Sequence, residues 1–463
     1  MPQTHTVILA AGKGVRMKSS TPKVLHPLGG YSLIEHVLRA AAPIRAASTT
    51  VVVNCRAERI RATLNRHADL QVVIQEQQLG TAHALLQTEP FLKGVKGSLV
   101  VLSGDVPLLR QETLTGLLRR HESTNPALTL LTAIATQPHG YGRVVRTRGR
   151  IVQVVEERDT SCQQREIHEI NSGIYVFDLE PLFEALHEIR PSGVQGEHPL
   201  PDLVTIYRRR QLPVETLMVE DSDEIYGINT LTELAEASRI VRQSKNKELM
   251  AAGVTIHDPA TTYIDVDVQV GPDTVVHPGV ILEGQTKVGA RCQLHSGVRI
   301  VDSTLDDDVT VNNHCVIFNS RLASGAKVGP FAHLRPASEV GKGAKIGNFV
   351  ELKKTVLGPG SKANHLSYLG DTVIGEQVNI GAGTITCNYD GAQKHQTIIE
   401  DGAFIGSGVQ LIAPVRLGRD AYIAAGSVVT HNVPAGALGI SRSQQENKES
   451  WVARKKSERS NCG

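Results

Sequence analysis

The feature that most constrains this chain is a series of large apolar residues spaced six apart between Ile264 and Val429. A helix repeats every 3.6 residues and a strand every two, so neither alone gives a sustained period of six. A β-helix does, because each six-residue face sends one large apolar side chain inward. The series contains two five-residue steps and one less regular stretch, and it comprises Ile264, Val270, Val276, Leu282, Val288, Leu294, Ile300, Leu305, Val311, Ile317, Leu322, Val328, Leu334, Val340, Ile346, Leu352, Ile374, Ile380, Ile399, Ile405, Leu411, Leu417, Ile423 and Val429.

Glycine often directly follows a residue of this series, as at Gly271 and Gly289, and it permits tight corners between faces. Three faces of six residues per coil, at about 4.8 Å between stacked strands, predict roughly ten coils in a prism near 50 Å long. The period does not determine the hand of the helix.

Composition limits the remaining choices. A chain of 463 residues is expected to form two or three domains, and 40% apolar with 21% charged residues describes a soluble globular protein. The net charge of +2 excludes the basic field of a nucleic-acid-binding protein. The cysteines have no metal-like or paired spacing, which favours free thiols; they are Cys55, Cys162, Cys292, Cys315, Cys387 and Cys462.

The apolar run Val7–Ala11 is too short for a signal peptide, and no apolar run reaches 18 residues. We therefore expect a cytoplasmic protein without membrane insertion.

Residues 6–229 alternate short apolar runs with helical patterns, which is typical of a doubly wound, mostly parallel sheet. Ligands bind such sheets at the carboxyl ends of the strands. The predicted strands are Thr6–Leu9, Thr50–Val53, Gln71–Ile74 and Leu99–Leu102, and the predicted helices include Ser32–Ala42 and Arg56–His67.

A glycine-containing loop follows the first of these strands, with the sequence LAAGKGVRM over residues 9–17 and TPKVL over residues 21–25. Small residues let backbone N–H groups approach phosphate oxygens, while Arg16 and Lys23 supply positive charge. Met17 replaces the third glycine of a dinucleotide fingerprint, and no Walker A motif is present. Alone, this loop is equally consistent with a plain structural turn.

Together with Gln75, the QLGT segment at 78–81 and the SGD segment at 103–105, this loop resembles the sugar-1-phosphate nucleotidyltransferase family. The resemblance implies a nucleotide site formed by Leu9, Ala10, Ala11, Gly12, Lys23, Gln75, Gly80, Thr81, Ser103, Gly104 and Asp105. Asp105 ends an apolar run, where an unpaired carboxylate is costly. Mg²⁺ bridging the phosphates is its natural partner, since Mg²⁺ takes one or two protein oxygens with phosphate oxygens.

Three further segments, YGR at 141–143, VEE at 155–157 and EINSG at 169–173, match uridylyltransferases of N-acetylglucosamine 1-phosphate when taken with GIN at 227–229. That resemblance implies sugar contacts at Gly142, Glu156 and Asn171 and a second magnesium ligand at Asn229. One departure is His198-Pro199, where this family usually has two tyrosines, so the pocket wall there is open to question.

A capping box at Thr230 and Glu233 predicts a helix to about Ala252, ended by Gly253. Its apolar face comprises Leu231, Leu234, Ala237, Ile240, Val241 and Leu249. We expect a nucleotidyltransferase domain over 1–229, this linker helix over 230–252, and a β-helix domain over 253–463 with a polar tail that is poorly ordered beyond Trp451.

The less regular stretch of the β-helix contains SKANHLSYLGD at 361–371 and NIGAGTITCNYDG at 379–391, and a polar loop interrupts the repeat between Thr386 and Thr397. Such insertions leave the prism and can form a site. Arg335 and Lys353 follow inward residues and should project outward. A histidine beside two cations in a water-poor pocket would stay neutral, as a general base requires. A lone histidine would more often be structural.

This half resembles the hexapeptide acyltransferases, which wind left-handed, and both halves in this order resemble bifunctional N-acetylglucosamine-1-phosphate uridylyltransferase/glucosamine-1-phosphate acetyltransferases. The resemblance implies that His365 is the catalytic base, with Arg16 and Lys23 catalytic in the first half. It assigns the sugar phosphate to Arg335, Lys353, Tyr368 and Asn379, and acetyl-CoA to Ala382, Asn388, Tyr389, Ser407, Ala425 and Arg442.

Two interpretations remain at this point. In the first, the enzyme acetylates glucosamine 1-phosphate with acetyl-CoA and then joins the product to UTP, supplying UDP-N-acetylglucosamine for peptidoglycan and lipopolysaccharide. In the second, it is a nucleotidyltransferase for glucose or mannose 1-phosphate whose β-helix only oligomerises or binds an effector. The segment around His365 favours the first. We also expect a homotrimer, since flat-sided prisms pack about a threefold axis, with acetyl-CoA bound where chains meet.

Overall fold

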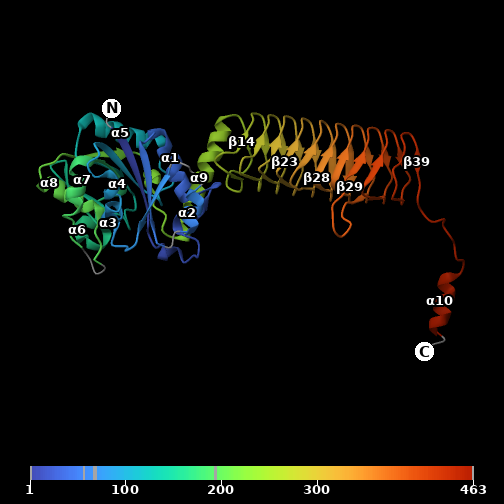
Figure 1. Cartoon of the computed structure of the whole chain (residues 1–463), viewed down its shortest axis with the longest axis horizontal. Helices are drawn as coiled ribbons and strands as arrows, with labels where there is room; N and C mark the ends of the chain where they lie inside the picture. Colours follow the sequence, from blue (N-terminus) through green and yellow to red (C-terminus); the bar gives the residue numbers. More distant parts are fainter. Residues whose placement is uncertain (1–2, 56–57, 66–69, 192–195, 461–463) are drawn as a thin grey trace. The chain divides into compact units, whose positions relative to one another are not determined.

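The computed structural model describes residues 3–55, 58–65, 70–191 and 196–460. The chain divides into two compact units, Met1–Val241 and Arg242–Gly463 (Figure 1). Each unit is described by itself.

The first unit is built on a mixed sheet with strand order β11-β7-β10-β6-β1-β4-β5. Its strands are β1 (Gln3–Ala10), β4 (Ser48–Asn54), β5 (Leu70–Gln75), β6 (Gly97–Ser103), β7 (Leu128–Ile134), β10 (Glu169–Asp178) and β11 (Val214–Val219), with β8 (Arg143–Thr147) and β9 (Arg150–Val155) joined beside β10 and a separate pair β2 (Pro27–Leu28) and β3 (Tyr31–Ser32). Strands β1, β4, β5 and β6 are parallel, and they contain the four predicted strands. Strand β10 runs antiparallel to both β6 and β7.

Helices cover both faces of this sheet: α1 (Leu33–Ala41), α2 (Glu58–Leu64), α3 (Thr81–Leu86), α4 (Glu89–Leu92), α5 (Gln111–Thr124), α6 (Cys162–Arg165), α7 (Leu179–Leu186) and α8 (Leu203–Arg209), with short 3-10 turns η1 (Val15–Met17), η2 (Lys23–Leu25), η3 (Ala42–Ile44), η4 (Glu157–Asp159), η5 (Leu200–Asp202) and η6 (Ser222–Ile225). Helix α1 confirms the first predicted helix and is capped reciprocally by Ser32 and Glu35. Helix α2 lies within the second, whose ends fall outside the described residues.

Alternating residues of the central strands fill two separate apolar layers. Val7 of β1 and Val101 of β6 lie in one core, whereas Ile8 and Val100 lie in the other. Because side chains alternate across a strand, burial on both faces requires the near-continuous apolar runs seen in the sequence. The carboxyl ends of β1, β5 and β6 are therefore held rigidly at one edge.

Helix α9 (Leu231–Ala251) contributes to both units. Glu233 accepts hydrogen bonds from the Asn229 and Thr230 backbones, and its own N–H donates to Thr230 Oγ1 at 3.2 Å, which completes the predicted capping box. Gly253 ends the helix with φ +92°, a conformation that favours glycine. Leu231 does not join the predicted apolar face, because it is 51% exposed.

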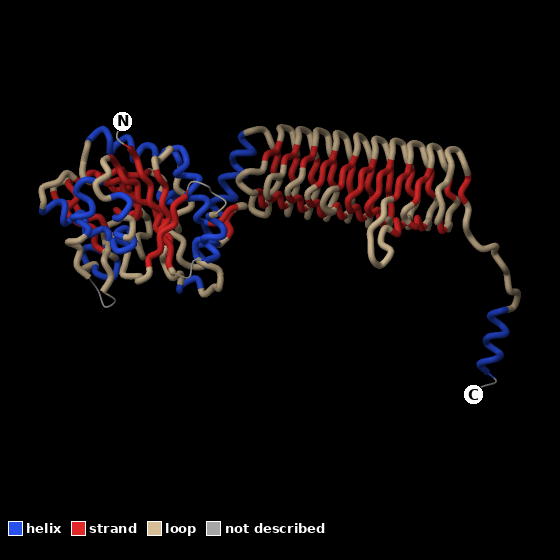
Figure 2. The backbone as a smooth tube through the Cα atoms, in the orientation of Figure 1, coloured by secondary structure: helices blue, strands red, loops and turns tan. Residues whose placement is uncertain are grey.

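The second unit is a parallel β-helix with three faces (Figure 2). One face comprises β12 (Thr255–Ile256), β15 (Val275–Val276), β18 (Gln293–Leu294), β21 (Thr310–Val311), β24 (Lys327–Val328), β27 (Lys345–Asn348), β29 (Lys362–His365), β31 (Asn379–Ile380), β34 (Phe404–Ile405), β37 (Tyr422–Ile423) and β39 (Leu438–Gly439). The other two faces comprise β13 (Tyr263–Ile264), β14 (Gln269–Val270), β16 (Ile281–Glu283), β17 (Lys287–Val288), β19 (Arg299–Val301), β20 (Thr304–Leu305), β22 (Val316–Phe318), β23 (Ser320–Leu322), β25 (His333–Leu334), β26 (Ser338–Val340), β28 (Glu351–Leu357), β30 (Tyr368–Ile374), β32 (Ile385–Cys387), β33 (Thr397–Ile399), β35 (Gln410–Ile412), β36 (Val415–Leu417) and β38 (Val428–Val429).

The six-residue series forms the interior of this prism. Every member is buried except Val270, which is half-buried. Ile264 pairs with Leu282, one coil of 18 residues later. The coil that pairs Ile374 with Ile399 is seven residues longer, because it contains the interrupting loop.

The tail corrects one expectation. Residues 451–460 were predicted to be poorly ordered, but they form the exposed helix α10 (Trp451–Ser460). Within the described residues, Cys55, Cys162, Cys292, Cys315 and Cys387 are free thiols, while Cys462 lies outside them. None of the described helices is long and apolar enough to cross a bilayer.

Candidate active sites

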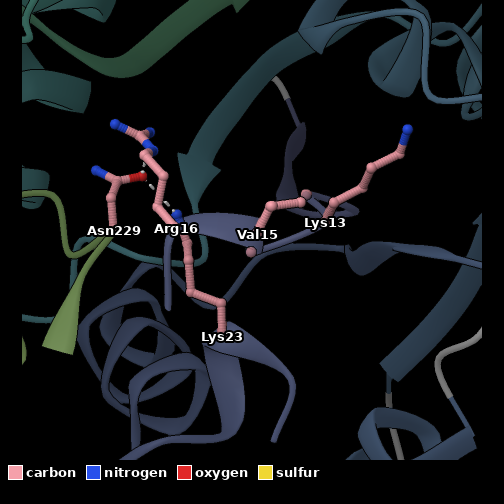
Figure 3. A pocket seen from close by; sticks show the side chains of 7 residues that line it. Lys13, Val15, Arg16, Lys23 and Asn229 are labelled. Carbon is pink, nitrogen blue, oxygen red and sulfur yellow. Dashed lines mark hydrogen bonds between the residues drawn. The ribbon is translucent and has the colours of Figure 1, made fainter. Parts of the chain in front are cut away.

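Two cationic side chains and two side chains with accepting oxygens meet where the strands of the first unit's sheet have their carboxyl ends. The Lys23 ammonium forms an ion pair with Asp105 Oδ2 and donates to Asn229 Oδ1 at 2.9 Å. Arg16 Nη2 also donates to Asn229 Oδ1, at 2.8 Å (Figure 3). A cavity of about 200 Å³ opens here, lined by Gly12, Lys13, Gly14, Val15, Arg16, Lys23 and Asn229.

Backbone contacts hold these four side chains together. The Ile228 N–H donates to the Asp105 carbonyl at 2.9 Å, so Asn229 emerges beside Asp105. Gly14 has φ +61°, and a Cβ there would lie 3.0 Å from Lys23 Cβ. The glycine loop therefore closes directly against Lys23, as phosphate binding by backbone N–H groups requires.

The donor set fits a hard cation. Asp105 Oδ2 and Asn229 Oδ1 both contact the Lys23 ammonium, so one carboxylate oxygen and one amide oxygen face the same cationic group. One carboxylate and one amide oxygen, completed by phosphate oxygens, is a ligand set that Mg²⁺ accepts. The described residues hold no cluster of three or more acidic, histidine or cysteine side chains that could bind a metal.

The residues expected to hold the nucleotide border the same edge. Leu9 and Ala10 end β1, Gln75 ends β5 and Ser103 ends β6. The Gly104 N–H donates to the Leu9 carbonyl at 2.9 Å, which joins two of these strand ends.

The QLGT segment, residues 78–81, is joined to this edge of the sheet by hydrogen bonds. Gln78 donates to the Ala11 carbonyl at 2.7 Å, and Gln75 donates to the Gly80 carbonyl at 3.1 Å. Thr81 Oγ1 accepts from the Leu200 N–H at 3.0 Å. Gly80 has φ +99°, and a Cβ there would lie 2.6 Å from the backbone nitrogen of His198. The departure from the family pattern at His198 therefore lies against the Gly80 turn.

The expected sugar contacts come from three neighbouring segments. The Asn171 N–H donates to the Gly142 carbonyl at 2.9 Å, and Asn171 Nδ2 donates to the buried Tyr175 hydroxyl at 2.7 Å. Glu156 follows β9, and burial raises the pKa of its carboxyl. The nearby carboxylates of Asp159, Asp202 and Glu197 raise it further, against the effect of Arg158.

In the β-helix, His365 lies at a corner and is exposed. Its Nδ1 lies 2.9 Å from Asn348 Oδ1, and the two residues are paired neighbours in adjacent coils. In this single chain the ring of His365 is accessible and its recorded side-chain partner is an amide oxygen, so the expected water-poor pocket with two cations stays a prediction. An amide oxygen only accepts hydrogen bonds, so Nδ1 is the donor in this contact and Nε2 is the ring nitrogen left to face a substrate.

The residues expected to bind acetyl-CoA continue along this corner. Successive backbone hydrogen bonds join His365 to Gly383 at 3.3 Å, Ala382 to Gly408 at 2.7 Å, and Ser407 to Gly426 at 2.8 Å. Arg442 Nη1 then donates to the Ala425 carbonyl at 2.9 Å. The side chains of this row are small, with Ser407 and Ala425 exposed and Ala382 half-buried.

The two cationic residues expected to bind the sugar phosphate, Arg335 and Lys353, each lie beside a carboxylate. Arg335 donates to Glu351 at 3.0 Å, and Lys353 Nζ lies 4.0 Å from Asp371, to which Asn388 also donates. Tyr368 begins β30 and Asn379 begins β31. Lys394 from the interrupting loop reaches Lys353, whose hydrogen bond and positive charge lower the pKa of Lys394. Glu351, Asp371 and Lys394 were missed from sequence, because only the coil stacking places them here.

Hydrogen bonds among its own residues hold the interrupting loop. The Asp390 carboxylate accepts from the N–H groups of Ala392 and Gln393 at 2.8 and 2.7 Å, and lies 2.7 Å from His395 Nε2. The Tyr389 hydroxyl donates to the Gly391 carbonyl at 2.6 Å.

Comparison with known proteins was made for the whole chain. Residues 6–171 match the MobA-like NTP transferase domain, and residues 396–431 match the bacterial transferase hexapeptide with six repeats. A protein named "Bifunctional protein GlmU" from Pelobacter propionicus is 48% identical over 98% of this chain and 99% of its own length. Proteins of the same name from Trichlorobacter lovleyi and Shouchella clausii are 46% and 45% identical, again over 98% of this chain and 99% of theirs.

Proposed function

The chain belongs to the bifunctional GlmU family, and from that premise we propose how its two units divide the work. The β-helix, over 253–463, transfers acetyl from acetyl-CoA to glucosamine 1-phosphate. The domain over 1–229 then transfers uridylyl from UTP to N-acetylglucosamine 1-phosphate and releases pyrophosphate. The product, UDP-N-acetylglucosamine, feeds peptidoglycan and lipopolysaccharide synthesis.

The observation that best supports the nucleotidyl step is the convergence of Lys23, Arg16, Asp105 and Asn229. A phosphate oxygen of the sugar phosphate attacks the α-phosphorus of UTP, and the bond to pyrophosphate breaks. Charge neutralisation and alignment by Arg16 and Lys23 supply the catalysis, and no protein nucleophile is needed. Mg²⁺ held by Asp105 and Asn229 would neutralise further phosphate charge when bound.

The remaining expected residues complete this site. Leu9, Ala10, Ala11 and Gly12, with Gln75, Gly80, Thr81, Ser103 and Gly104, hold base and ribose. Gly142, Glu156 and Asn171 bind the sugar.

Acetyl transfer rests on His365. Its Nε2 takes a proton from the amine as the nitrogen attacks the thioester carbonyl carbon, and the C–S bond then breaks to release the CoA thiolate, which is reprotonated. The hydrogen bond to Asn348 supports this role, because it fixes the tautomer with a free Nε2. Arg335, Lys353, Tyr368 and Asn379 bind the sugar phosphate. Acetyl-CoA lies along Ala382, Ser407, Ala425 and Arg442, with Asn388 and Tyr389 from the loop side.

We also propose a homotrimer of left-handed β-helices in the cytoplasm. Exposed free thiols at Cys55 and Cys162 support a reducing compartment. The alternative, a single-activity nucleotidyltransferase, is disfavoured by the organised row from His365 to Arg442, which a scaffold would not need.

Incubation of the protein with glucosamine 1-phosphate, acetyl-CoA, UTP and Mg²⁺ tests the proposal by the appearance of UDP-N-acetylglucosamine. Asp105→Ala should abolish uridylyl transfer, at a loss of several kcal/mol in barrier height, and leave acetyl transfer unchanged. His365→Ala should slow acetyl transfer by about 10²–10⁴-fold and spare uridylyl transfer from preformed N-acetylglucosamine 1-phosphate. Equal loss of both activities in either variant contradicts this division of labour.

A further inference from the structure

Glu157, a residue without an assigned role, contacts His139 in the loop between β7 and β8 and Arg143 at the start of β8. Its Oε1 lies 3.1 Å from His139 Nδ1, and its Oε2 lies 2.7 Å from Arg143 Nη2. The Gly140 N–H also hydrogen-bonds to this carboxylate. Although burial alone raises the pKa of Glu157, the bonds and charge of Arg143, with Gly140 and His139, lower it overall.

The partner of this carboxylate is a fully enclosed charge. The Arg143 side chain is only 2% exposed, and its guanidinium also donates to the Tyr141 carbonyl. A buried guanidinium requires a counter-charge, and such pairs fix one local geometry more than they add stability. Glu157 is the counter-ion recorded for Arg143 in the described part of the chain.

The clamped loop reaches two parts of the proposed uridylyltransferase site. The Tyr141 hydroxyl accepts from the Gly227 N–H at 3.3 Å, two residues before Asn229. Gly142 accepts from the Asn171 N–H at 2.9 Å, and a Cβ at Gly142 would lie 3.2 Å from Val154. A shift of the Gly142 backbone therefore disturbs its hydrogen bond to Asn171 on the sugar side.

We propose that Glu157 is a positioning residue of the uridylyltransferase site, which through its ion pair with Arg143 locks the His139–Gly142 loop and so places Gly142 and Glu156 against the sugar phosphate. The inference rests on the proposed function of this unit. Glu156 precedes Glu157 directly and is half-buried, so anchoring Glu157 through Arg143 also fixes the backbone from which the Glu156 side chain extends. The nucleotide end, at Gln75 and Gly80, makes no recorded contact with this clamp.

The test uses the full chain with Glu157→Gln, which keeps the side-chain size and removes the charge, and Glu157→Asp, which keeps the charge on a shorter stem. Glu166→Gln is the matched control, since this exposed acid at the end of α6 lies outside the clamp. We expect Glu157→Gln to raise the KM for N-acetylglucosamine 1-phosphate about tenfold or more, with the KM for UTP within about twofold of wild type. Glu157→Asp should recover part of the loss, and Glu166→Gln should match wild type.

Acetyl transfer by the same samples normalises the protein concentration, and thermal unfolding of the first unit reports whether that unit is folded. Parallel increases in both KM values, or unchanged kinetics with only a lower unfolding temperature, would make Glu157 a merely structural residue and overturn the proposal. If Glu157→Gln does not fold, His139→Ala tests the same proposal. This change removes the contact between the exposed His139 ring and Glu157, and it should raise only the KM for the sugar phosphate. A wild-type protein that makes no UDP-sugar would instead refute the proposed function itself.

Discussion

At the residue scale, the proposed sugar contact Glu156 shows how burying a carboxyl group lowers the stability of the folded protein. Burial raises the pKa of this carboxyl in the folded protein. An acid with a raised folded pKa contributes most stability below its unfolded pKa of about 4.5, and that contribution is lost as pH rises through the folded value. At neutral pH the half-buried Glu156 therefore destabilises the first unit relative to its contribution below pH 4.5.

We expect Glu156→Gln to raise the unfolding temperature of the uridylyltransferase unit at neutral pH, and the gain to shrink toward the ordinary pKa of 4.5. The same change should raise the KM for N-acetylglucosamine 1-phosphate, because a carboxylate accepts hydrogen bonds from sugar hydroxyls better than an amide does. Thermal unfolding at two pH values, with paired kinetics, measures both effects. A gain that is larger at acidic pH would refute this assignment of the shift.

Asn348 is the second prediction at this scale. Since its Oδ1 accepts from His365 Nδ1, Asn348→Ala should free the ring to adopt the wrong tautomer and rotate. We expect kcat for acetyl transfer to fall about tenfold to a hundredfold, less than in His365→Ala, with uridylyl transfer unchanged. Asn348→Asp, which can still accept, should retain most of the activity. Equal kcat values for acetyl transfer in wild type and Asn348→Ala would show that His365 does not need the hydrogen bond to Asn348.

The sequence predicted site residues best where a motif follows a strand. Asp105 and Lys23 follow strands or loops that a doubly wound sheet brings to one edge, and the structure joins them in an ion pair. Asn348 and Glu157 were not predicted, because neither has a local pattern of its own. Their partners lie 17 and 14 residues away, at His365 and Arg143, and only the coil pairing and the strand pairing bring them together.

At the element scale, the six-residue series predicted the β-helix interior almost completely. Buried apolar residues recur there because stacked coils leave room for only one inward side chain per face. The five-residue steps correspond to 17-residue coils, such as that joining Ile300 to Ile317. The second half of the mixed sheet was not predicted in detail, since antiparallel β10 and its bulge near Asn171 depend on tertiary pairing with β7.

The interrupting loop is an element in its own right, organised by Asp390. Backbone N–H groups of Gln393 and Ala392 and the ring of His395 hold the pKa of Asp390 far below its usual range. An acid whose pKa is lowered in the folded protein stabilises it above the unfolded-state pKa, and this stabilisation is lost as the pH falls through the folded-state pKa. The hydrogen bonds of Asp390 therefore stabilise the loop at neutral pH.

We expect Asp390→Ala to open this loop, making residues 388–396 sensitive to limited proteolysis, and to abolish most acetyl transfer while uridylyl transfer persists. Lys394 would no longer be held near Lys353, which removes one cation from the proposed phosphate site. Glu376→Gln, at another exposed corner acid, is the control and should behave as wild type. A protease-resistant Asp390→Ala loop with normal acetyl transfer would show that these bonds are dispensable.

At the scale of the whole molecule, the proposed trimer has a candidate contact surface on the corner that leads to His365. Phe331 and Phe349 stack with ring centroids 5.5 Å apart and are 48% and 57% exposed, and Leu366 is 62% exposed. All three have positive φ, a conformation that disfavours bulky residues by roughly 1–2 kcal/mol each. Exposed apolar residues with a strained backbone, gathered on the corner that leads to His365, indicate a surface that another chain covers.

The final prediction links this surface to activity. Phe331→Asp, placed two coils from His365, should yield monomers by light scattering and eliminate acetyl transfer, because the proposed acetyl-CoA site then lacks its covering chain. Uridylyl transfer should persist, since Lys23, Asp105 and Asn229 meet within one chain. Phe91→Asp, at an aromatic residue 51% exposed in the first unit, controls for an added surface charge. Dilution of the wild type should separate the two activities in the same way, and a monomer fully active in acetyl transfer would show that one chain completes the site alone.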